Sequence, residues 1–226
     1  CALPIFSVRK DDSAKYLFMA TNNGTVKKTA LSDFANIRQN GIVAIKLDSG
    51  DKLSWVKKTG GEDSIIISTA MAQAIRFNEK DARPMGRATR GVRGIRLRKD
   101  DQVVGMDVLS GDEGLMLVIM ENGYGKITKS NQFTSHNRGG VGIKAGVVTS
   151  KTGKAVDVRI ISSQDDDVLI ISKKGQVIRM KLSDIPVIGR STQGVRIMRI
   201  SEGDKIASIA ILPNEVSEAS ETPDEK

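Results

Sequence analysis

Residues 115–126 read Leu-Met-Leu-Val-Ile-Met-Glu-Asn-Gly-Tyr-Gly-Lys, which is six apolar residues, a glycine turn and the start of a basic strand. A continuous apolar run of this length is typical of a strand buried on both faces, and Asn-Gly is a strong signal for a tight turn between antiparallel strands. The same pattern occurs at Tyr16–Lys28, Ile65–Arg76 and Val168–Arg179. The turn positions, residues 24, 72, 123 and 175, are 48 to 52 residues apart. The chain therefore contains four copies of one unit.

Each copy has a second landmark downstream, where basic or polar residues lead to glycine and then to β-branched residues. The four examples are Arg38–Val43, Arg87–Val92, Asn137–Val141 and Arg190–Val195, whose glycines are spaced by 50, 49 and 54 residues. Two landmarks with one period near fifty, and about four short strands per copy, predict an all-β fold built as a propeller-like radial array of four-stranded blades. Helical periodicity is weak, so we expect only a turn or two of helix in the connections.

The period divides the chain into four blade repeats, expected at residues 16–63, 64–114, 115–166 and 167–212. Residues 1–15 are interpreted as a partial strand from a preceding repeat, because a strand-like sequence is already running at Ala2–Val8. We therefore expect the chain to be a fragment of a longer protein. From Pro213 onward Ser, Glu and Pro dominate, so residues 213–226 are predicted to be a disordered acidic tail.

The charge of the chain suggests a polyanionic partner. The 35 Lys and Arg residues outnumber the 27 Asp and Glu residues, which gives a net charge of +8. Five of the acids lie in the last fourteen residues, so the rest of the chain has 34 basic and 22 acidic residues, a net charge of +12. Nucleic acid is such a partner, although surface basicity that serves solubility alone is an alternative.

Several classes of function lack their sequence signals. Cys1 is the single cysteine and His136 the single histidine, so the sequence predicts no disulfide within the chain, no metal site and a reducing cytoplasm. The longest apolar run, at residues 115–120, is too short to cross a bilayer. There is no phosphate-binding loop of the Walker type and no nucleophile with a histidine partner. We therefore expect no catalytic residue and no cofactor in this chain.

The densest basic element runs from Arg87 to Lys99, with six cations around three glycines. Guanidinium groups hold phosphates, and glycine allows close approach of backbone amides to them. The alternative is that the glycines form a bend into a strand and that the arginines decorate a solvated edge. Recurrence of an arginine at matching places in the other copies favours phosphate contact. The predicted DNA-binding residues are Lys27, Lys28, Arg38, Lys46, Arg76, Arg87, Arg90, Arg93, Arg96, Lys126, Lys129, Arg138, Lys144, Arg179, Arg190 and Arg196.

The small number of aromatic residues favours duplex over single-stranded DNA. Single strands are usually bound on aromatic stacking platforms, but the chain has only eight Phe, Trp and Tyr residues in total. Tyr124, between two glycines and next to a lysine, is expected to be exposed, where it could touch DNA or cover a blade edge. A duplex bent along a curved row of cations is bound mostly through counterion release, so we expect little sequence specificity.

Four stretches, Tyr16–Thr29, Met85–Ile95, Asn122–Lys126 and Val187–Val195, resemble the C-terminal DNA-wrapping domain of the A subunit of bacterial DNA gyrase, which is a type IIA topoisomerase. The resemblance implies a β-pinwheel, a disc whose blades exchange strands and whose basic rim wraps double-stranded DNA during ATP-dependent negative supercoiling. It further implies that ATP and Mg²⁺ act elsewhere in the parent enzyme. The implied partners are the remainder of the gyrase A polypeptide and the gyrase B polypeptide in an A2B2 assembly in the bacterial cytoplasm, associated with the nucleoid. The isolated domain is expected to be monomeric.

The sequence departs from that family in two respects. The family disc usually has six repeats, and its first blade carries a Gln-Arg-Arg-Gly-Gly-Lys-Gly box; this chain has four repeats, and its nearest match, His136–Gly142, has Val141 in place of the Lys. Whether the chain wraps DNA or only binds it is therefore open. The equivalent domain of topoisomerase IV, which serves decatenation, is one alternative. A protein-interaction propeller is another, and the low aromatic content argues against it.

Overall fold

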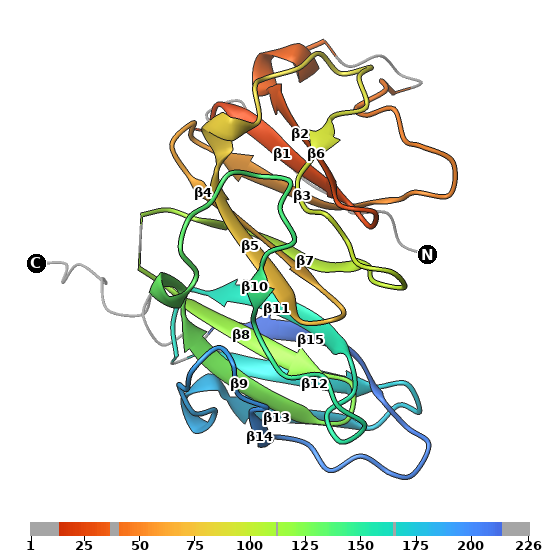
Figure 1. Cartoon of the computed structure of the whole chain (residues 1–226), viewed down its shortest axis with the longest axis vertical. Coiled ribbons are helices and arrows are strands. Elements are labelled where there is room, and N and C mark those ends of the chain that lie inside the picture. The colour runs from red at the N-terminus through yellow and green to blue at the C-terminus, as the bar shows by residue number, and fades with distance from the viewer. Residues whose placement is uncertain (1–13, 37–40, 112, 165, 214–226) are drawn as a thin grey trace, which may run out of the picture.

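The computed structural model describes residues 14–36, 41–111, 113–164 and 166–213. Within these ranges it is all-β, as predicted, with fifteen strands in four antiparallel sheets that follow one another along the molecule (Figure 1). Four 3₁₀ turns occupy the connections after the second strand of each repeat, and no helix of the described ranges is long and apolar enough to cross a membrane. These turns are η1 (Leu31–Phe34), η2 (Glu79–Asp81), η3 (Ser130–Gln132) and η4 (Leu182–Asp184).

Each sheet is built from a tight hairpin and the strand that follows it in the chain. Sheet A has the order β3 (Leu53–Thr59), β1 (Tyr16–Thr21), β2 (Thr25–Ala30), β6 (Val92–Arg93). Sheet B has the order β10 (Ile143–Lys144), β5 (Gln73–Asn78), β4 (Ser64–Thr69), β7 (Val103–Leu109). Sheet C has the order β11 (Ala155–Ile161), β8 (Leu115–Met120), β9 (Tyr124–Lys129), β14 (Val195–Arg196). Sheet D has β13 (Val177–Lys181), β12 (Asp167–Ser172) and β15 (Ile206–Leu212).

The hairpin turns adopt the left-handed backbone conformation that the sequence predicts. The φ angles are +82° at Gly24, +52° at Ala72, +83° at Gly123 and +87° at Gly175. Glycine reaches this region without steric cost, whereas the Cβ of Ala72 makes it strained.

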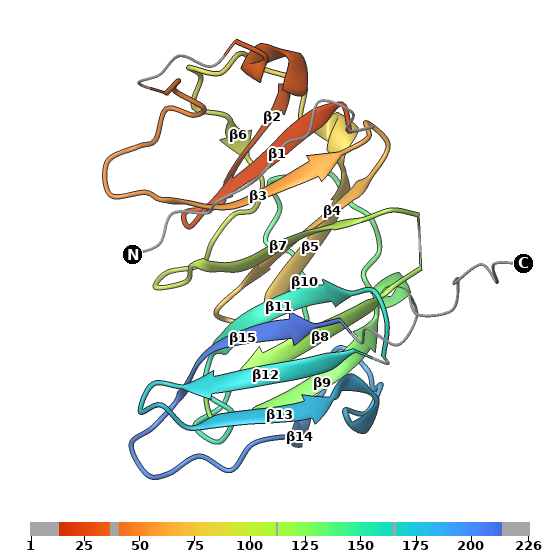
Figure 2. The same ribbon diagram turned by 180° about the vertical axis from the view of Figure 1, so that it is seen from behind.

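The sheets exchange strands, so that the repeats of the sequence and the sheets of the structure do not coincide. The two-residue strands β6, β10 and β14 each leave their own repeat and pair with the hairpin of the preceding one. They form one edge of each sheet, while β3, β7, β11 and β15 form the opposite edge, seen from behind in Figure 2. Sheet D has no such fourth strand in the described part of the chain.

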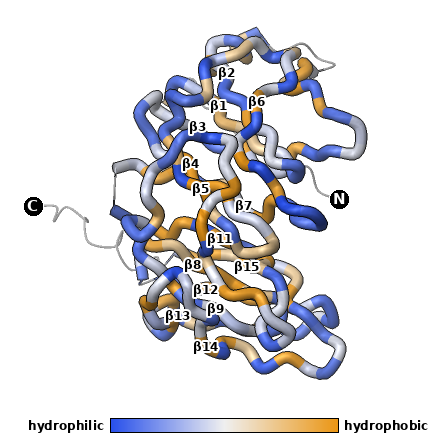
Figure 3. Tube along the Cα trace, in the orientation of Figure 1, coloured by the Kyte–Doolittle hydropathy of each residue, from blue (hydrophilic) through white to orange (hydrophobic). Residues whose placement is uncertain are grey.

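The core lies between consecutive sheets as three apolar clusters. The first contains Phe18 and Phe77, whose ring centroids are 6.2 Å apart, and it joins sheets A and B. The second joins sheets B and C around Met116 and Phe133, and the third joins sheets C and D around Ile119 and Ile170. Burial of each large apolar side chain contributes about 1.5–3 kcal/mol. In Figure 3 the hydrophobic segments follow the strands, and the β6–β7 loop is hydrophilic.

Sheet D departs from the burial predicted for the apolar first strands. In β1, β4 and β8 five of the six residues are buried. In β12 buried residues alternate with half-buried ones, and β13 alternates between exposed and half-buried positions. Sheet D is the last of the stack, so one of its faces has no neighbouring sheet in the described chain.

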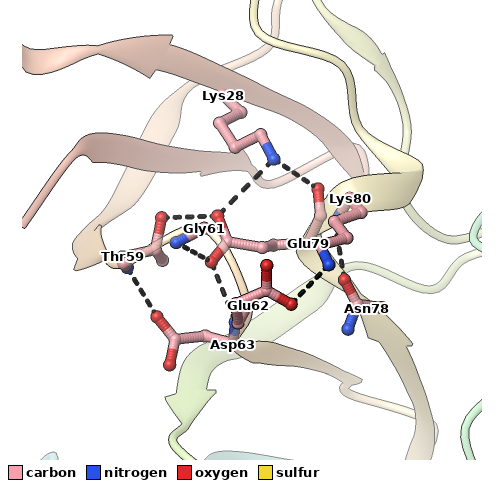
Figure 4. A network of polar contacts seen from close by, with 9 residues as sticks. Lys28, Thr59, Gly61, Glu62, Asp63, Asn78, Glu79 and Lys80 are labelled. Carbon is pink, nitrogen blue, oxygen red and sulfur yellow. Dashed lines mark hydrogen bonds and ion pairs between the residues drawn. The ribbon is translucent and has the colours of Figure 1, made fainter.

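A buried carboxylate locks sheet A to sheet B. Glu79 of η2 is fully buried; its Oε1 accepts hydrogen bonds from Gly61 N at 2.7 Å and Asp63 N at 2.9 Å, and its Oε2 accepts one from Thr59 Oγ1 at 2.8 Å (Figure 4). Lys28 Nζ of β2 lies 3.6 Å from Glu79 Oε2 and donates to the Glu79 carbonyl oxygen at 2.9 Å. A carboxylate satisfied in this way holds the end of one sheet against the next.

Candidate nucleic-acid interface

The exchanged strands begin at glycines that no other residue could replace without a collision. Gly91, Gly142 and Gly194 have φ angles of +105°, +72° and +81°. A Cβ on Gly142 would lie 2.5 Å from Ala74 O, one on Gly194 would lie 2.5 Å from Gly125 O, and one on Gly91 would collide with Val26 O. These glycines thus serve close packing of strand on strand, the alternative that the sequence left open.

The same register corrects the alignment of the third repeat. The equivalent of Gly91 is Gly142, not Gly140, because Val92, Ile143 and Val195 occupy the same place in their ladders. With Gly41, which also has a positive φ of +76°, the series is spaced by 50, 51 and 52 residues.

One exposed cation follows at the same position of each exchanged strand. Arg93 pairs with Thr25 in the ladder of sheet A, Lys144 with Gln73 in sheet B, and Arg196 with Tyr124 in sheet C. The three side chains are exposed. Successive sheets therefore present successive positive charges along the same edge of the stack, which we name the cationic edge.

The loops before these strands bring one arginine each toward the cationic edge. Arg138 donates from Nε to Asp81 O at 2.9 Å and from Nη1 to Arg93 O at 2.9 Å. Arg190 donates from Nη1 to Lys144 O at 3.1 Å. These two residues and Arg87 are half-buried. Arg138 and Arg190 thus each fasten their loop to the exchanged strand of the preceding repeat.

Other predicted cations are exposed around this edge or elsewhere. Arg90 forms an ion pair with Asp48 at 3.0 Å, and Arg179 forms one with Asp167 at 2.6 Å. The remaining exposed members of the predicted set are Lys46, Arg96 and Lys129. Arg38, the tail from residue 214 onward and residues 1–13 lie outside the described residues.

Four predicted DNA-binding residues are buried, so the structure does not support direct phosphate contact by them. Their positions are on the second hairpin strands, where the sequence pattern suggested an exposed basic strand. Lys28 belongs to the Glu79 lock, and Arg76 donates to Ser64 Oγ at 3.3 Å. The other two ammonium groups point at backbone carbonyls of neighbouring loops. The four are Lys27, Lys28, Arg76 and Lys126.

Tyr124 is also buried, contrary to the expectation that it is exposed. Its hydroxyl accepts a hydrogen bond from Arg196 Nη2 at 3.2 Å, and this bond is the main cause that lowers the pKa of Tyr124. The Arg196 guanidinium and the Lys151 ammonium lie 5.7 Å and 5.4 Å from the ring centroid. Tyr124 therefore orients a cation of the interface through its hydroxyl and its ring face.

Sequence reasoning missed one exposed cation that the repeat alignment could have found. Arg199 lies five residues after Gly194, as Arg96 does after Gly91 and Lys46 after Gly41. All three side chains are exposed. The misplaced glycine of the third repeat concealed this series, whose third member is Val147.

The site shows no arrangement suited to metal chemistry. Within the residues that the structure describes, no group of three or more His, Cys, Asp and Glu side chains could hold a metal ion.

Comparison with known proteins supplies the family. A sequence model described as "DNA gyrase C-terminal domain, beta-propeller" matches residues 15–59, 63–110, 117–162 and 166–213. The chain belongs to this family. The gyrase resemblance recognised in the sequence motifs is thereby confirmed, and with it the β-pinwheel class of fold.

The curated relatives of this gyrase family member are much longer than the chain itself. The DNA gyrase A polypeptide of Aminobacterium colombiense is 40% identical over 210 residues, which make up 93% of this chain and 26% of that protein. The DNA gyrase A polypeptide of Staphylococcus epidermidis is 41% identical over 196 residues, 86% of this chain and 22% of that protein. The chain thus spans about a quarter of the length of the curated relatives it matches.

Two solved structures share its architecture. A DNA gyrase A C-terminal domain matches with a TM-score of 0.78 at 25% identity, covering 89% of this chain and 67% of that one. The C-terminal domain of a DNA topoisomerase IV matches with a TM-score of 0.82 at 21% identity, covering 89% and 62%. The second likeness concerns the fold alone.

Proposed function

We propose that this chain binds duplex DNA along the cationic edge and bends it around the stack of sheets, as the DNA-wrapping part of a gyrase A polypeptide. The observation that carries the proposal is the exposed cation repeated at one register position on three consecutive exchanged strands, at Arg93, Lys144 and Arg196. A regular row of charges that follows the stack suits a regular row of phosphates.

The chemistry of the edge favours binding without sequence specificity. The exchanged strands are two residues long and are paired into the sheet edges, so no helix or ribbon of the described chain projects to enter a major groove. Long cationic side chains on such an edge reach phosphates, whereas sequence is read from base edges in the grooves. The proposed contacts are the exposed Lys46, Arg90, Arg93, Arg96, Lys129, Lys144, Arg179, Arg196 and Arg199, with Arg87, Arg138 and Arg190 behind them.

The wider role follows from the relatives, which are named as the A component of DNA gyrase. We propose that the chain is a non-catalytic accessory to ATP-dependent negative supercoiling in bacterial cytoplasm at the nucleoid. Its partners would be the remainder of the gyrase A polypeptide and the gyrase B polypeptide in an A2B2 assembly. DNA binding by the chain itself would need no cofactor, because cationic side chains supply the contacts; chelation of divalent ions should leave binding in place.

The experiment that tests DNA binding compares two triple variants of the full 226-residue chain. The first replaces Arg93, Lys144 and Arg196 with alanine. The matched control replaces Lys52, Lys154 and Lys205, which are exposed residues immediately before β3, β11 and β15 on the opposite sheet edge. Both variants lose three positive charges, so they differ only in where the charges lie.

The readout is the slope of log affinity against log salt for a duplex of mixed sequence, measured by fluorescence anisotropy. Each lost phosphate contact should reduce the magnitude of the slope by about 0.9, so the first triple should reduce it by about 2.7. The control should leave the slope close to that of the original chain. Equal slopes in the two triples would reject the cationic edge as the DNA-binding surface.

A further inference from the structure

Two of the three junctions between repeats contain a buried lysine at one structurally equivalent position. Val26, Ala74 and Gly125 pair with the first residue of an exchanged strand, so the residues that follow them are equivalent. Those residues are Lys27, Ile75 and Lys126. All three are buried, with exposed fractions of 0%, 2% and 1%.

The Lys126 ammonium is surrounded by the backbone of the next repeat. Its Nζ donates to Arg190 O at 2.6 Å, Gly189 O at 2.9 Å and Thr192 O at 3.1 Å, and it lies 3.3 Å from Thr192 Oγ1. An ammonium has three N–H donors, and three carbonyl oxygens of one turn accept from it. A single side chain thus fixes three peptide groups of a loop that is distant in the sequence.

Lys27 makes the same kind of contact at the junction of sheets A and B. Its Nζ donates to Ala44 O at 2.7 Å and to Arg87 O. The carbonyl of Arg87 is the counterpart of the carbonyl of Arg190, because Arg87 precedes Gly91 by four residues as Arg190 precedes Gly194. The lysine therefore holds the equivalent arginine in both junctions.

The two loops held by lysine share a turn that the third loop lacks. Both read Gly-Arg-x-Thr, at Gly86–Thr89 and Gly189–Thr192. The threonine hydroxyl donates to the glycine carbonyl at 2.9 Å in the first loop and at 2.7 Å in the second. The loop over Ile75 reads Asn137-Arg138-Gly139-Gly140, and a Cβ on Gly140 would lie 3.6 Å from Ile75 Cδ1. Lysine and the Gly-Arg-x-Thr turn thus occur together.

The lysines are not needed to fill the core, because isoleucine does so at the same position of the second repeat. Burial of an ammonium is unfavourable: desolvation lowers the pKa of Lys27 and of Lys126 to about 8, and the nearby Arg190 guanidinium lowers that of Lys126 as well. A group that carries such a cost and contacts the arginine turn is explained by what it does to that turn.

We propose that Lys27 and Lys126 are positioning residues of the DNA interface. Each ammonium fixes the arginine turn of the following repeat, so that Arg87 and Arg190 are presented to phosphates in one place without any contact between the lysine and DNA. The inference rests on the proposed function for its consequence, and on the hydrogen bonds of the turn for its structural basis.

A double-mutant cycle tests the consequence. Lys126→Met and Arg190→Ala should each weaken duplex binding by about threefold to tenfold, the value of one net hydrogen bond. Because Lys126 acts through the arginine turn, the double variant should be no weaker than Arg190→Ala alone. Lys52→Met, which removes an exposed charge on the opposite sheet edge, should combine additively with Arg190→Ala.

A second measurement needs no DNA. Tryptic cleavage after Arg190, relative to cleavage after Arg138 in the loop over Ile75, should rise several-fold in Lys126→Met. Thr192→Val, which removes the hydroxyl that closes the turn and leaves the buried lysine in place, should raise the same ratio if Lys126→Met does not fold.

The two measurements separate the possible failures. An unchanged cleavage ratio would overturn the proposal whatever the DNA result. A raised ratio with an additive cycle would reduce Lys126 to a structural role and overturn its positioning of a DNA contact. Failure of the proposed function would instead appear in the alanine variants of Arg93, Lys144 and Arg196, which leave the turn untouched.

Discussion

The ammonium nitrogen of Lys126 lies 2.6 Å from the carbonyl oxygen of Arg190, although the two residues are 64 positions apart. This contact joins the hairpin of sheet C to a loop of the next repeat, whose exchanged strand β14 completes the same sheet. The position of each arginine is therefore determined by the neighbouring repeat rather than by its own sheet. Four consequences of such packing can be measured.

The buried lysine should make stability depend on alkaline pH. Burial holds the pKa of Lys126 at about 8 in the folded chain, against an ordinary value of 10.5. Below about pH 8 both folded and unfolded chains keep this proton. Between about pH 8 and 10.5 the unfolded chain binds more protons, so the lysine makes the free energy of unfolding rise with pH.

Urea denaturation of the original chain and of Lys126→Met checks this sign. The difference in the free energy of unfolding should shift in favour of the original chain between about pH 7.5 and 9.5. Other titrating groups are common to both proteins and cancel. A difference that stays flat or moves the opposite way would contradict the lowered pKa.

The Glu79 lock should be sensitive to removal of its charge. Glu79→Gln keeps the shape of the side chain but turns an oxygen that accepts hydrogen bonds into an amide nitrogen and leaves Lys28 without its buried carboxylate. Breaking a buried ion pair by changing one partner costs about 3–5 kcal/mol, so we expect a loss of roughly that size in urea denaturation.

The matched control is the exposed ion pair between Glu62 and Lys80 of the same region, shown in Figure 4. Its side chains are 78% and 59% exposed, so Glu62→Gln should change stability by less than about 1 kcal/mol. Similar losses in the two variants would mean that Glu79 is not a lock between the sheets.

Turn glycines should differ in cost according to whether an exchanged repeat covers them. Gly123 and Gly175 have nearly equal φ angles of +83° and +87°. A Cβ on Gly123 would collide with Met198 O of the next repeat, whereas one on Gly175 would meet nothing within 4 Å. Ala72 occupies this turn position in the second repeat, so alanine is tolerated where space permits.

We therefore expect Gly175→Ala to cost about 1–2 kcal/mol, the strain of a left-handed alanine. Gly123→Ala should cost about 1–3 kcal/mol more, because the overlap with Met198 forces the exchanged segment to move. Thermal and urea denaturation of the two variants give the comparison. Equal costs would show that the segment around Met198 does not press on the turn in solution.

The fold was predictable from the sequence where the signal is local. An apolar run followed by Asn-Gly or Lys-Gly specifies a hairpin, and its fourfold recurrence specifies the stack. The partner of each exchanged strand was not predictable from the residues themselves, because two residues such as Val92 and Arg93 contain no local signal for the sheet they join. That choice is made by long-range packing, as at Gly91, where only a glycine admits the backbone of β2.

The candidate site was predictable in kind but not in every member. The pattern of glycine turn and basic strand placed Lys27 and Lys126 on an exposed surface, but both side chains are buried. Alternation of side chains could not reveal this, because the second hairpin strands of the first three repeats are buried on both faces. Comparison between repeats could have done so, since Ile75 and Ile178 occupy the same position and mark it as apolar.

The last prediction concerns the path of DNA over the stack. If Arg93, Lys144 and Arg196 contact one duplex on three consecutive sheets, the duplex follows the edge of a stacked arc and is bent, because bending brings successive phosphates to successive cations. Ligation of nicked circular plasmid in low salt with excess chain, followed by removal of the protein, should therefore give a linking-number distribution displaced from that of a protein-free control. The alanine triple at these residues should give no displacement, while the triple at Lys52, Lys154 and Lys205 should retain it. Binding without displacement in the original chain would mean that the cationic edge is a straight track, and that bending requires parts of the parent protein outside this chain.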